Sequence, residues 1–146
     1  MLQNTLSQFP SFHDGYLTGI ELAETSAVVA LQHYDGTRYR LHLSGIEALL
    51  ANEFRQGNII SSLKVTTGTS PDIGDLRLLW PALHPEVTDE YRHTNEIFVE
   101  DQRSKIERGE AVWLKLTASY GCDLVAVCKS VELVALDINA NSQISN

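Results

Sequence analysis

Hydrophobic and polar residues alternate most regularly over residues 37–43. The hydrophobic positions there share one side of an extended chain: Tyr39, Leu41 and Leu43. This period of two is typical of a strand that buries one face. A β-branched run over residues 28–34 precedes it, and Asp35-Gly36 between the two favours a tight turn. The pattern predicts an antiparallel hairpin over residues 28–43, centred on Asp35-Gly36.

Four more stretches, rich in β-branched residues or in alternation, predict further strands: residues 15–24, 58–67, 110–118 and 124–136. The alternation is clear in residues 110–118, where one side carries Val112, Leu114 and Leu116. The last stretch is long enough for one long strand or for a pair of strands.

Residues 44–57 show helical spacing instead. Apolar residues recur every three or four positions between Ile46 and Phe54. Ser44 and Glu47 have the spacing of a capping box, and Gly57 is a typical residue for the end of a helix. We therefore expect a short helix in this segment.

Residues 88–108 begin with acids and end with bases, an order that suits the helix dipole, and Gly109 follows as a cap. We expect one long helix here, although Ile97-Phe98-Val99 leaves a short strand open. The residues expected on its buried side step by three, four or seven: Val87, Tyr91, Thr94, Phe98 and Lys105.

The predicted strands follow one another in hairpins and do not alternate with helices as βαβ units do. We therefore expect an α+β fold, a mainly antiparallel sheet with one long helix and one short helix packed on it. The chain of 146 residues has the usual size of one domain and contains no low-complexity linker. We expect a single domain over residues 1–138 and a frayed polar tail over residues 139–146.

The chain carries 19 acidic and 11 basic residues, a net charge of −8. Because nucleic acids and anionic membranes are polyanions, this charge disfavours both as partners. The acidic excess is largest in residues 71–110, which hold ten acids and five bases. That segment either faces a basic protein partner or forms a solvated helix face that keeps the protein soluble.

The two cysteines, Cys122 and Cys128, would be too far apart on one extended strand for a disulfide bond. Two unpaired thiols are typical of a reducing compartment. The first residues lack the charged start and apolar core of a secretion signal, and the longest apolar run is Leu124–Cys128. We expect a cytoplasmic protein without a membrane segment.

The sequence lacks the phosphate-binding loop, the dinucleotide fingerprint, the His-Glu-x-x-His zinc motif, a Cys-x-x-Cys pair and the Gly-x-Ser-x-Gly elbow. These absences argue against nucleotide-dependent enzymes, common zinc hydrolases and α/β-hydrolases. We expect no cofactor and no bound metal.

The most suggestive local pair is His13-Asp14, just before the first predicted strand. An imidazole beside a carboxylate can act as a general base or bind a metal, with a further group such as Tyr120 supplied from a distance. His33 and His42 fall too far apart along the hairpin to share a metal ion. The same dipeptide also suits a turn in which the aspartate binds backbone amides.

Four other side chains are candidates for binding. Glu96 and Glu100 share one side of the predicted helix, either as a carboxylate pair or as part of a solvated face. Trp80 precedes a proline in a loop, where it either meets a partner or closes the end of the core. Tyr120 opens a predicted turn and, like the other tyrosines, supplies aromatic surface for recognition.

Five short motifs are spread over residues 9–135: Phe12-His13-Asp14, Leu41-x-Leu43-x-Gly45-Ile46, Gly57-Asn58-Ile59-Ile60, Ser119-Tyr120-Gly121 and Cys128. Together they resemble a group of small bacterial domains, some of which are similar to immunity proteins of polymorphic toxin systems. The resemblance implies a small bacterial, cytoplasmic α+β protein that binds and blocks a toxin. It implies no catalytic residue.

These observations favour a non-enzymatic protein-binding module, such as a toxin-neutralising immunity protein, whose acidic surface speeds association with a basic partner. The alternative is a small enzyme or ligand-binding domain that uses His13 and Asp14 with a distant partner. A flat acidic surface over residues 86–107 would indicate the first, and a deep pocket around His13 and Asp14 the second. A structural subunit of an oligomer is a third alternative.

Overall fold

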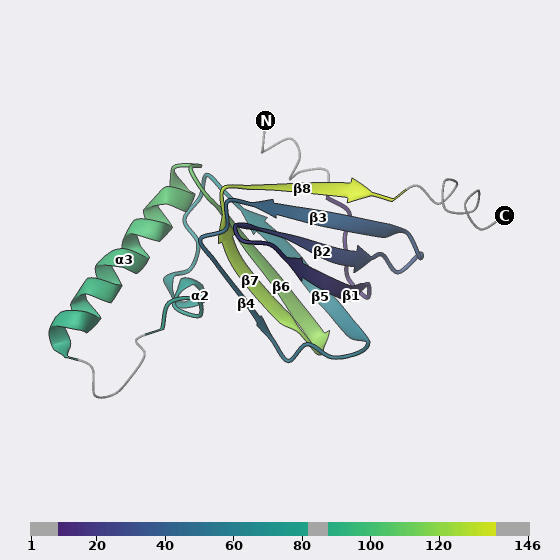
Figure 1. Cartoon of the computed structure of the whole chain (residues 1–146), viewed down its shortest axis with the longest axis horizontal. Coiled ribbons are helices and arrows are strands. Elements are labelled where there is room, and N and C mark those ends of the chain that lie inside the picture. The colour runs from purple at the N-terminus through teal and green to yellow at the C-terminus, as the bar shows by residue number, and fades with distance from the viewer. Residues whose placement is uncertain (1–8, 82–87, 137–146) are drawn as a thin grey trace.

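The computed structural model describes residues 9–81 and 88–136, and its strands form one antiparallel sheet (Figure 1). The strands are β1 (Tyr16–Leu22), β2 (Ser26–Gln32), β3 (Arg38–Ser44), β4 (Ala48–Asn52), β5 (Asn58–Thr66), β6 (Val112–Tyr120), β7 (Asp123–Cys128) and β8 (Ser130–Ala135). The helices in these ranges are α2 (Ile73–Leu76) and α3 (Asp89–Glu107). The expected α+β class holds in outline, although sheet predominates. The expected tail at residues 139–146 lies outside the described residues.

The sheet folds back on itself into two halves. Its strand order is β4-β7-β6-β5-β1-β2-β3-β8. In the chain, β3 is followed by β4 and β7 is followed by β8. Because β3 pairs with β8 and β4 pairs with β7, these two segments run side by side from one half of the sheet to the other. One half is β8-β3-β2-β1 and the other is β5-β6-β7-β4, and Figure 1 shows them diverging from a common end. At the centre of the sheet, β1 and β5 pair through two residues each.

The main core lies between the two halves. Alternate residues of each strand contribute to it, including Leu41 and Leu43 from β3 and Leu114 and Leu116 from β6. The residues between them lie on the opposite side of each strand. The alternation predicted for residues 37–43 and 110–118 is therefore confirmed.

A second cluster covers the outer side of β6 and β7. Leu76 of α2 and Val99 and Ile106 of α3 pack there against Trp113 and Val127. The helices thus form a third layer on one half of the sheet. Figure 1 shows that the amino-terminal end of α3 lies farthest from the strands.

The short helix expected in residues 44–57 is wrong, because residues 48–52 form β4. Gly45 adopts a φ of 65°, which bends the chain after β3. β4 then pairs with β7 over its whole length. Leu49 packs against the main core and Leu50 against the second cluster. These neighbouring apolar residues therefore pack on opposite sides of β4. Burial on both sides and the sheet hydrogen bonds outweigh the local helical pattern.

The hairpin over residues 28–43 is confirmed, but its register differs by one residue from the expected one. His33 N–H donates a hydrogen bond to Thr37 O over 2.8 Å, which leaves a three-residue loop. Gly36 has a φ of 94°, as the last residue of such a loop requires. Asp35 Oδ1 accepts a hydrogen bond from Thr37 N–H over 2.8 Å and holds this longer turn.

The long helix expected over residues 88–108 is confirmed as α3, and it includes Ile97-Phe98-Val99. Val87 lies outside the described residues. For the others the expected buried side is wrong, since Tyr91 and Phe98 are 44% and 41% exposed. The residues of α3 that are buried instead share another side: Val99, Gln102 and Ile106. The expected and the observed buried residues both have helical spacing. Which set is covered depends on where the second cluster lies, and spacing along the sequence does not reveal that position.

Cys122 and Cys128 are free and buried, so the expectation of unpaired thiols is confirmed. Burial raises the pKa of the Cys128 thiol from an ordinary 9.0 to about 12. The unfolded chain therefore ionises first as the pH rises. The contribution of this thiol to stability is complete below about pH 9 and is lost as the pH rises toward about 12.

We expect Cys128→Ala to remove this part of the pH dependence. Urea unfolding of both proteins at about pH 8 and about pH 10.5 measures the effect. The wild-type protein should lose more stability than the variant at the higher pH, so the difference in unfolding free energy between them should shrink. A difference that stays the same at both pH values would contradict the assignment.

Candidate functional site

Asn58, the first residue of β5, joins three segments at one end of the sheet. Its side chain is 1% exposed and bonds only to backbone groups. Oδ1 accepts hydrogen bonds from Arg55 N–H over 2.8 Å and from Cys122 N–H over 3.0 Å. Nδ2 donates to the carbonyls of Leu17 and Arg55. The loop of residues 53–57, the β6–β7 turn and β1 are therefore fixed relative to one another.

Gly121, in the turn between β6 and β7, lies directly against this side chain. Its φ is 88°, and a Cβ atom at this position would collide with Asn58 Oδ1. Both the backbone conformation and the available space therefore require glycine. The turn expected to begin at Tyr120 is confirmed in this form.

Large apolar side chains are exposed beside Asn58. Tyr16, Ile59 and Tyr120 occupy directly paired positions on β1, β5 and β6, so they form one row across three strands. Because neighbouring strands lie about 4.8 Å apart, the two tyrosines flank Ile59 closely. Tyr16 is 41% exposed, Tyr120 is 52% exposed, and Phe54 on the adjoining loop is 49% exposed. We call Tyr16, Phe54, Ile59 and Tyr120 the aromatic end.

Irregular strand pairing surrounds the aromatic end. The register of β1 shifts between Leu17 and Gly19, and that of β5 shifts on both sides of Ile60. Thr18, at the shift in β1, is exposed, and its hydroxyl donates to Ala30 O over 3.2 Å. Such bulges redirect side chains and are frequent beside functional sites.

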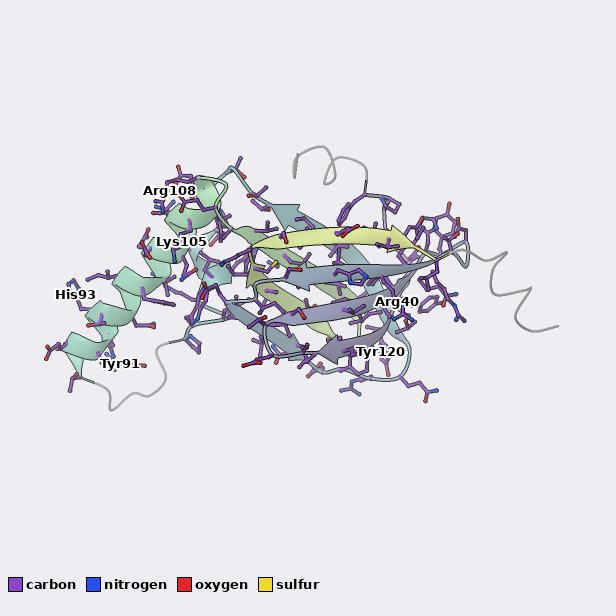
Figure 2. All side chains as sticks on the ribbon, turned by 45° about the horizontal axis from the view of Figure 1, so that its top comes forward. Arg40, Tyr91, His93, Lys105, Arg108 and Tyr120 are labelled. Atoms are coloured by element: carbon purple, nitrogen blue, oxygen red, sulfur yellow. The ribbon has the colours of Figure 1, made fainter. Side chains whose placement is uncertain are left out.

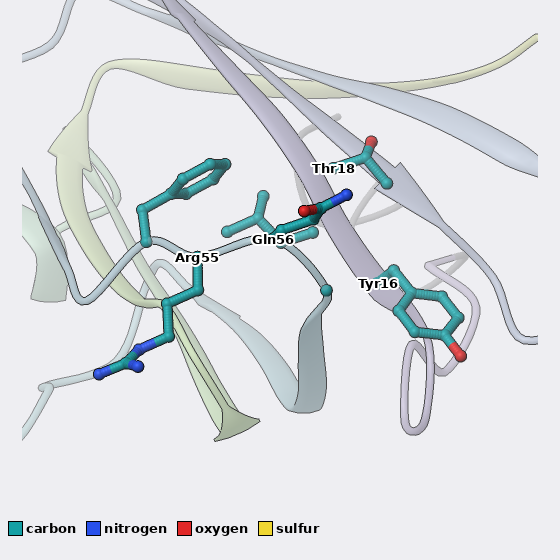
Figure 3. Close-up of a pocket in the computed structure, with 7 residues that line it drawn as sticks. Tyr16, Thr18, Arg55 and Gln56 are labelled. Atoms are coloured by element: carbon teal, nitrogen blue, oxygen red, sulfur yellow. The ribbon is translucent and has the colours of Figure 1, made fainter.

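A hollow of about 500 Å³ lies between β1 and the loop of residues 53–57 (Figure 3). Tyr16 and Thr18 line it from the strand, and Phe54, Arg55 and Gln56 line it from the loop. In Figure 3, Gln56 extends toward Thr18, whereas Arg55 points away from Tyr16. The lining therefore offers aromatic, hydroxyl and amide groups to a partner.

Carboxylates rim the aromatic end. Asp14 precedes β1, Glu53 begins the loop, and Asp123 begins β7 beside the last residue of β4. All three residues are exposed. Arg55 lies on the same loop, and Arg38 and Arg40 line a second hollow with Thr18, so carboxylates and guanidinium groups both lie near the aromatic end.

His13 and Asp14 lie in the tight turn of residues 12–15, and Asp14 has a left-handed φ of 63°. Both side chains are largely exposed, and His13 Nε2 lies 3.6 Å from Asp14 Oδ2. His13 Nδ1 lies 3.0 Å from Ser61 O on β5. The turn expected for this pair is present, but the carboxylate faces the imidazole instead of backbone amides.

The hollow does not bring together the groups of the alternative enzyme or ligand-binding site, because none of His13, Asp14 and Tyr120 lines it. They border the start of β5, where Asp14 N–H donates to Ile60 O and Tyr120 pairs with Ile59. Among the residues that the structure describes, no group of three or more His, Cys, Asp or Glu side chains is placed to hold a metal ion. His13 and Asp14 are thus rim residues of the aromatic end.

The carboxylates of Glu96 and Glu100 are both engaged by arginines. Glu96 accepts hydrogen bonds from Arg77 Nε over 3.2 Å and from Arg77 Nη2 over 2.9 Å. Glu100 accepts one from Arg103 Nε over 2.8 Å. These contacts raise the pKa of Arg77 above its ordinary value, chiefly through the hydrogen bond to Glu96. The two carboxylates therefore carry little unbalanced charge.

Trp80 lies at the border of the second cluster and packs edge-on against Phe98, with ring centroids 5.2 Å apart. Its backbone carbonyl accepts a hydrogen bond from Asn95 Nδ2 over 3.1 Å. Figure 2 shows Tyr91 of α3 on the opposite side of the molecule from Tyr120. The six candidate residues therefore divide between two separate surfaces.

The sequence pattern indicated Tyr120 as a binding residue but not Phe54 or Arg55, because the expected helix ran through them. Asn58 was considered only as part of the motif Gly57-Asn58-Ile59-Ile60, one of those that carry the family resemblance. The pattern that could have singled it out is a polar residue between Gly57 and the apolar pair Ile59-Ile60, where its side chain enters a turn.

No protein-family model, curated protein or solved structure significantly matches the chain. In the described part of the chain, no helix combines the length and apolar character needed to cross a membrane. Function is therefore inferred from the geometry and charge of the described residues.

Proposed function

We propose that this protein is a non-enzymatic recognition module that binds a basic protein at its aromatic end, as a toxin-neutralising immunity protein would. The observation that carries the proposal is the row of Tyr16, Ile59 and Tyr120, in which both tyrosines are exposed and Ile59 is half-buried, with the exposed Phe54 beside it. Aromatic side chains provide much of the binding energy of interfaces, because they bury large areas with few rotatable bonds. A cluster of exposed apolar side chains is typical of an interaction site.

The hydrogen bonds of Asn58 support this proposal. They hold β1, the loop of residues 53–57 and the β6–β7 turn in place before any partner arrives. A preorganised surface loses less conformational freedom on binding and therefore binds more tightly.

The charge of the protein supports a basic partner. A net charge of −8 attracts a cationic protein over a distance and speeds encounter, an effect that salt weakens. Near the aromatic end, Asp14, Glu53 and Asp123 supply carboxylates at short range. Because Glu96 and Glu100 are engaged by arginines, we place the contact here and not on α3.

Retention of partners from a lysate of the source organism tests the proposal. The baits are the immobilised wild-type protein and the aromatic-end variant Tyr16→Ser/Phe54→Ser/Tyr120→Ser. We expect the wild-type bait to retain a basic protein at low salt and to release it at high salt. The aromatic-end variant should retain little of it, as mass spectrometry would quantify.

A matched variant controls for loss of exposed apolar surface. Leu22→Ser/Leu78→Ser/Ile97→Ser changes three exposed residues outside the aromatic end and should retain the partner like the wild-type bait. Circular dichroism checks that all baits are folded. The proposal is contradicted if the wild-type bait retains no basic protein, or if both variants retain it equally.

A further inference from the structure

The outer side of the β8-β3-β2-β1 half carries two arginines without partners. Arg38 and Arg40 are both exposed and lie two residues apart on β3. Among the residues that the structure describes, no hydrogen bond or ion pair engages either guanidinium group. Two arginines of the helical layer differ, since Arg77 and Arg103 bond to glutamates. Two positive charges are therefore left unbalanced on this side of an acidic protein.

The two guanidinium groups can reach the same point. Side chains two residues apart on a strand project to the same face, and their bases lie about 7 Å apart. Arg38 pairs with Gln32 of β2, and Arg40 pairs with Ala30 of the same strand. Side chains as long as these can turn toward each other at that separation and hold one anion between them.

The hollow that the two arginines line has a volume of about 270 Å³. Thr18 of β1 and Ala30 and Gln32 of β2 also line it. Gly19, Ala30 and Arg40 occupy directly paired positions on three neighbouring strands. Because glycine has no side chain and alanine has only a methyl group, this row leaves open space beside Arg40.

The described residues that line the hollow include no carboxylate. Glu21 and Glu132 lie in the next row of paired positions on this face, with Val28 and His42 between them. Neither glutamate lines the hollow. The lining thus presents two positive charges, which attract an anion.

Two guanidinium groups match a phosphate monoester better than a carboxylate. The phosphate carries nearly two negative charges near neutral pH and three terminal oxygens, so it can bind both arginines. A carboxylate carries one charge and two oxygens, which a single guanidinium group satisfies. The Thr18 hydroxyl donates to Ala30 O over 3.2 Å, so its oxygen remains to accept a hydrogen bond from a ligand hydroxyl. The amide of Gln32 can both donate and accept.

From these observations we infer that the hollow binds a small, hydroxyl-bearing phosphate monoester. Arg38 and Arg40 hold the phosphate, and Thr18 and Gln32 contact the hydroxyl groups of the ligand. The lining includes none of the four residues of the aromatic end, so binding here does not depend on a protein partner.

Titration of the ¹⁵N-labelled full chain at constant ionic strength, followed by two-dimensional NMR, tests the inference. Glycerol 3-phosphate should shift the amide signals of residues 30–32 and 38–40 and saturate with a Kd of about 1 mM or less. Inorganic phosphate should bind more weakly, because it lacks the organic hydroxyl groups that Thr18 and Gln32 contact. Glycerate, a hydroxy acid with one carboxylate, should bind at least about tenfold more weakly.

Three variants locate the site. Arg38→Gln/Arg40→Gln should weaken the binding of glycerol 3-phosphate by about tenfold or more, because it removes charge-assisted hydrogen bonds. Lys64→Gln/Lys129→Gln removes two charges from exposed residues outside the hollow and should bind within about twofold of the wild-type protein. Ala30→Leu keeps both arginines but fills the hollow, so it should also weaken binding. The dispersion of the NMR signals shows whether each variant is folded.

Three results would overturn the inference. The first is a wild-type spectrum in which glycerol 3-phosphate causes no saturable shift. The second is equal affinity of the arginine variant and the lysine variant. The third is binding of glycerate or inorganic phosphate as tight as that of glycerol 3-phosphate.

Discussion

Replacing Asn58 with alanine is expected to lower the free energy of unfolding by about 3 kcal/mol or more. The substitution removes the hydrogen-bond partners of backbone groups in three segments, including the buried Leu17 O and Cys122 N–H. Each buried polar group left without a partner costs about 1–3 kcal/mol. Urea unfolding followed by circular dichroism measures the loss.

Asn52→Ala is the matched control for this prediction. Asn52 is exposed at the end of β4, so its replacement should change stability by less than about 0.5 kcal/mol. Gly121→Ala disturbs the same network from the other side, because its Cβ would displace Asn58 Oδ1. If Asn58→Ala costs no more than Asn52→Ala, the three segments do not depend on Asn58.

Trp113→Ala is expected to cost about 3–5 kcal/mol, the usual range for a large aromatic residue removed from a core. Trp113 is 3% exposed and lies between the sheet and the helices, in contact with the cluster that includes Leu76 and Val99. Its loss leaves a cavity beneath α2 and α3. Amide exchange in α3 should therefore accelerate more than exchange in β2 and β3, which belong to the other half of the sheet.

Trp80→Ala serves as the comparison, because it removes the same side chain from the partly exposed border of that cluster. Its cost should be clearly smaller than that of Trp113→Ala. Equal costs, or uniform acceleration of amide exchange across the sheet, would show that the helices are not a separate layer held by Trp113.

Local pattern predicts strands well where one strand face is buried and the other is not. Residues 37–43 and 110–118 alternate cleanly, and both are strands with the expected inner residues. The helix over residues 88–108 could be predicted equally well, because its caps and the order of its charged residues are local features of the sequence. These features depend on neighbours in the sequence.

Features that depend on distant neighbours could not be predicted. Leu49 and Leu50 are buried on opposite sides of β4 by elements that come from other parts of the chain, so their spacing looked helical. The aromatic end is assembled by pairing of β1, β5 and β6. Nothing near Tyr16 or Tyr120 in the sequence indicates that Ile59 lies between them. Tyr91 and Phe98 were expected to be buried because their helical spacing is local, whereas the sheet that covers another side of α3 comes from other parts of the chain.

Calorimetric titration of the retained basic partner into this protein tests the central claim most directly. Tyr120→Ala should weaken binding by about thirtyfold, as expected for an interface residue worth about 2 kcal/mol. Ile97→Ala, at an exposed site on α3, should bind within about twofold of the wild-type protein. Wild-type affinity for Tyr120→Ala would contradict the assignment of the aromatic end as the recognition surface.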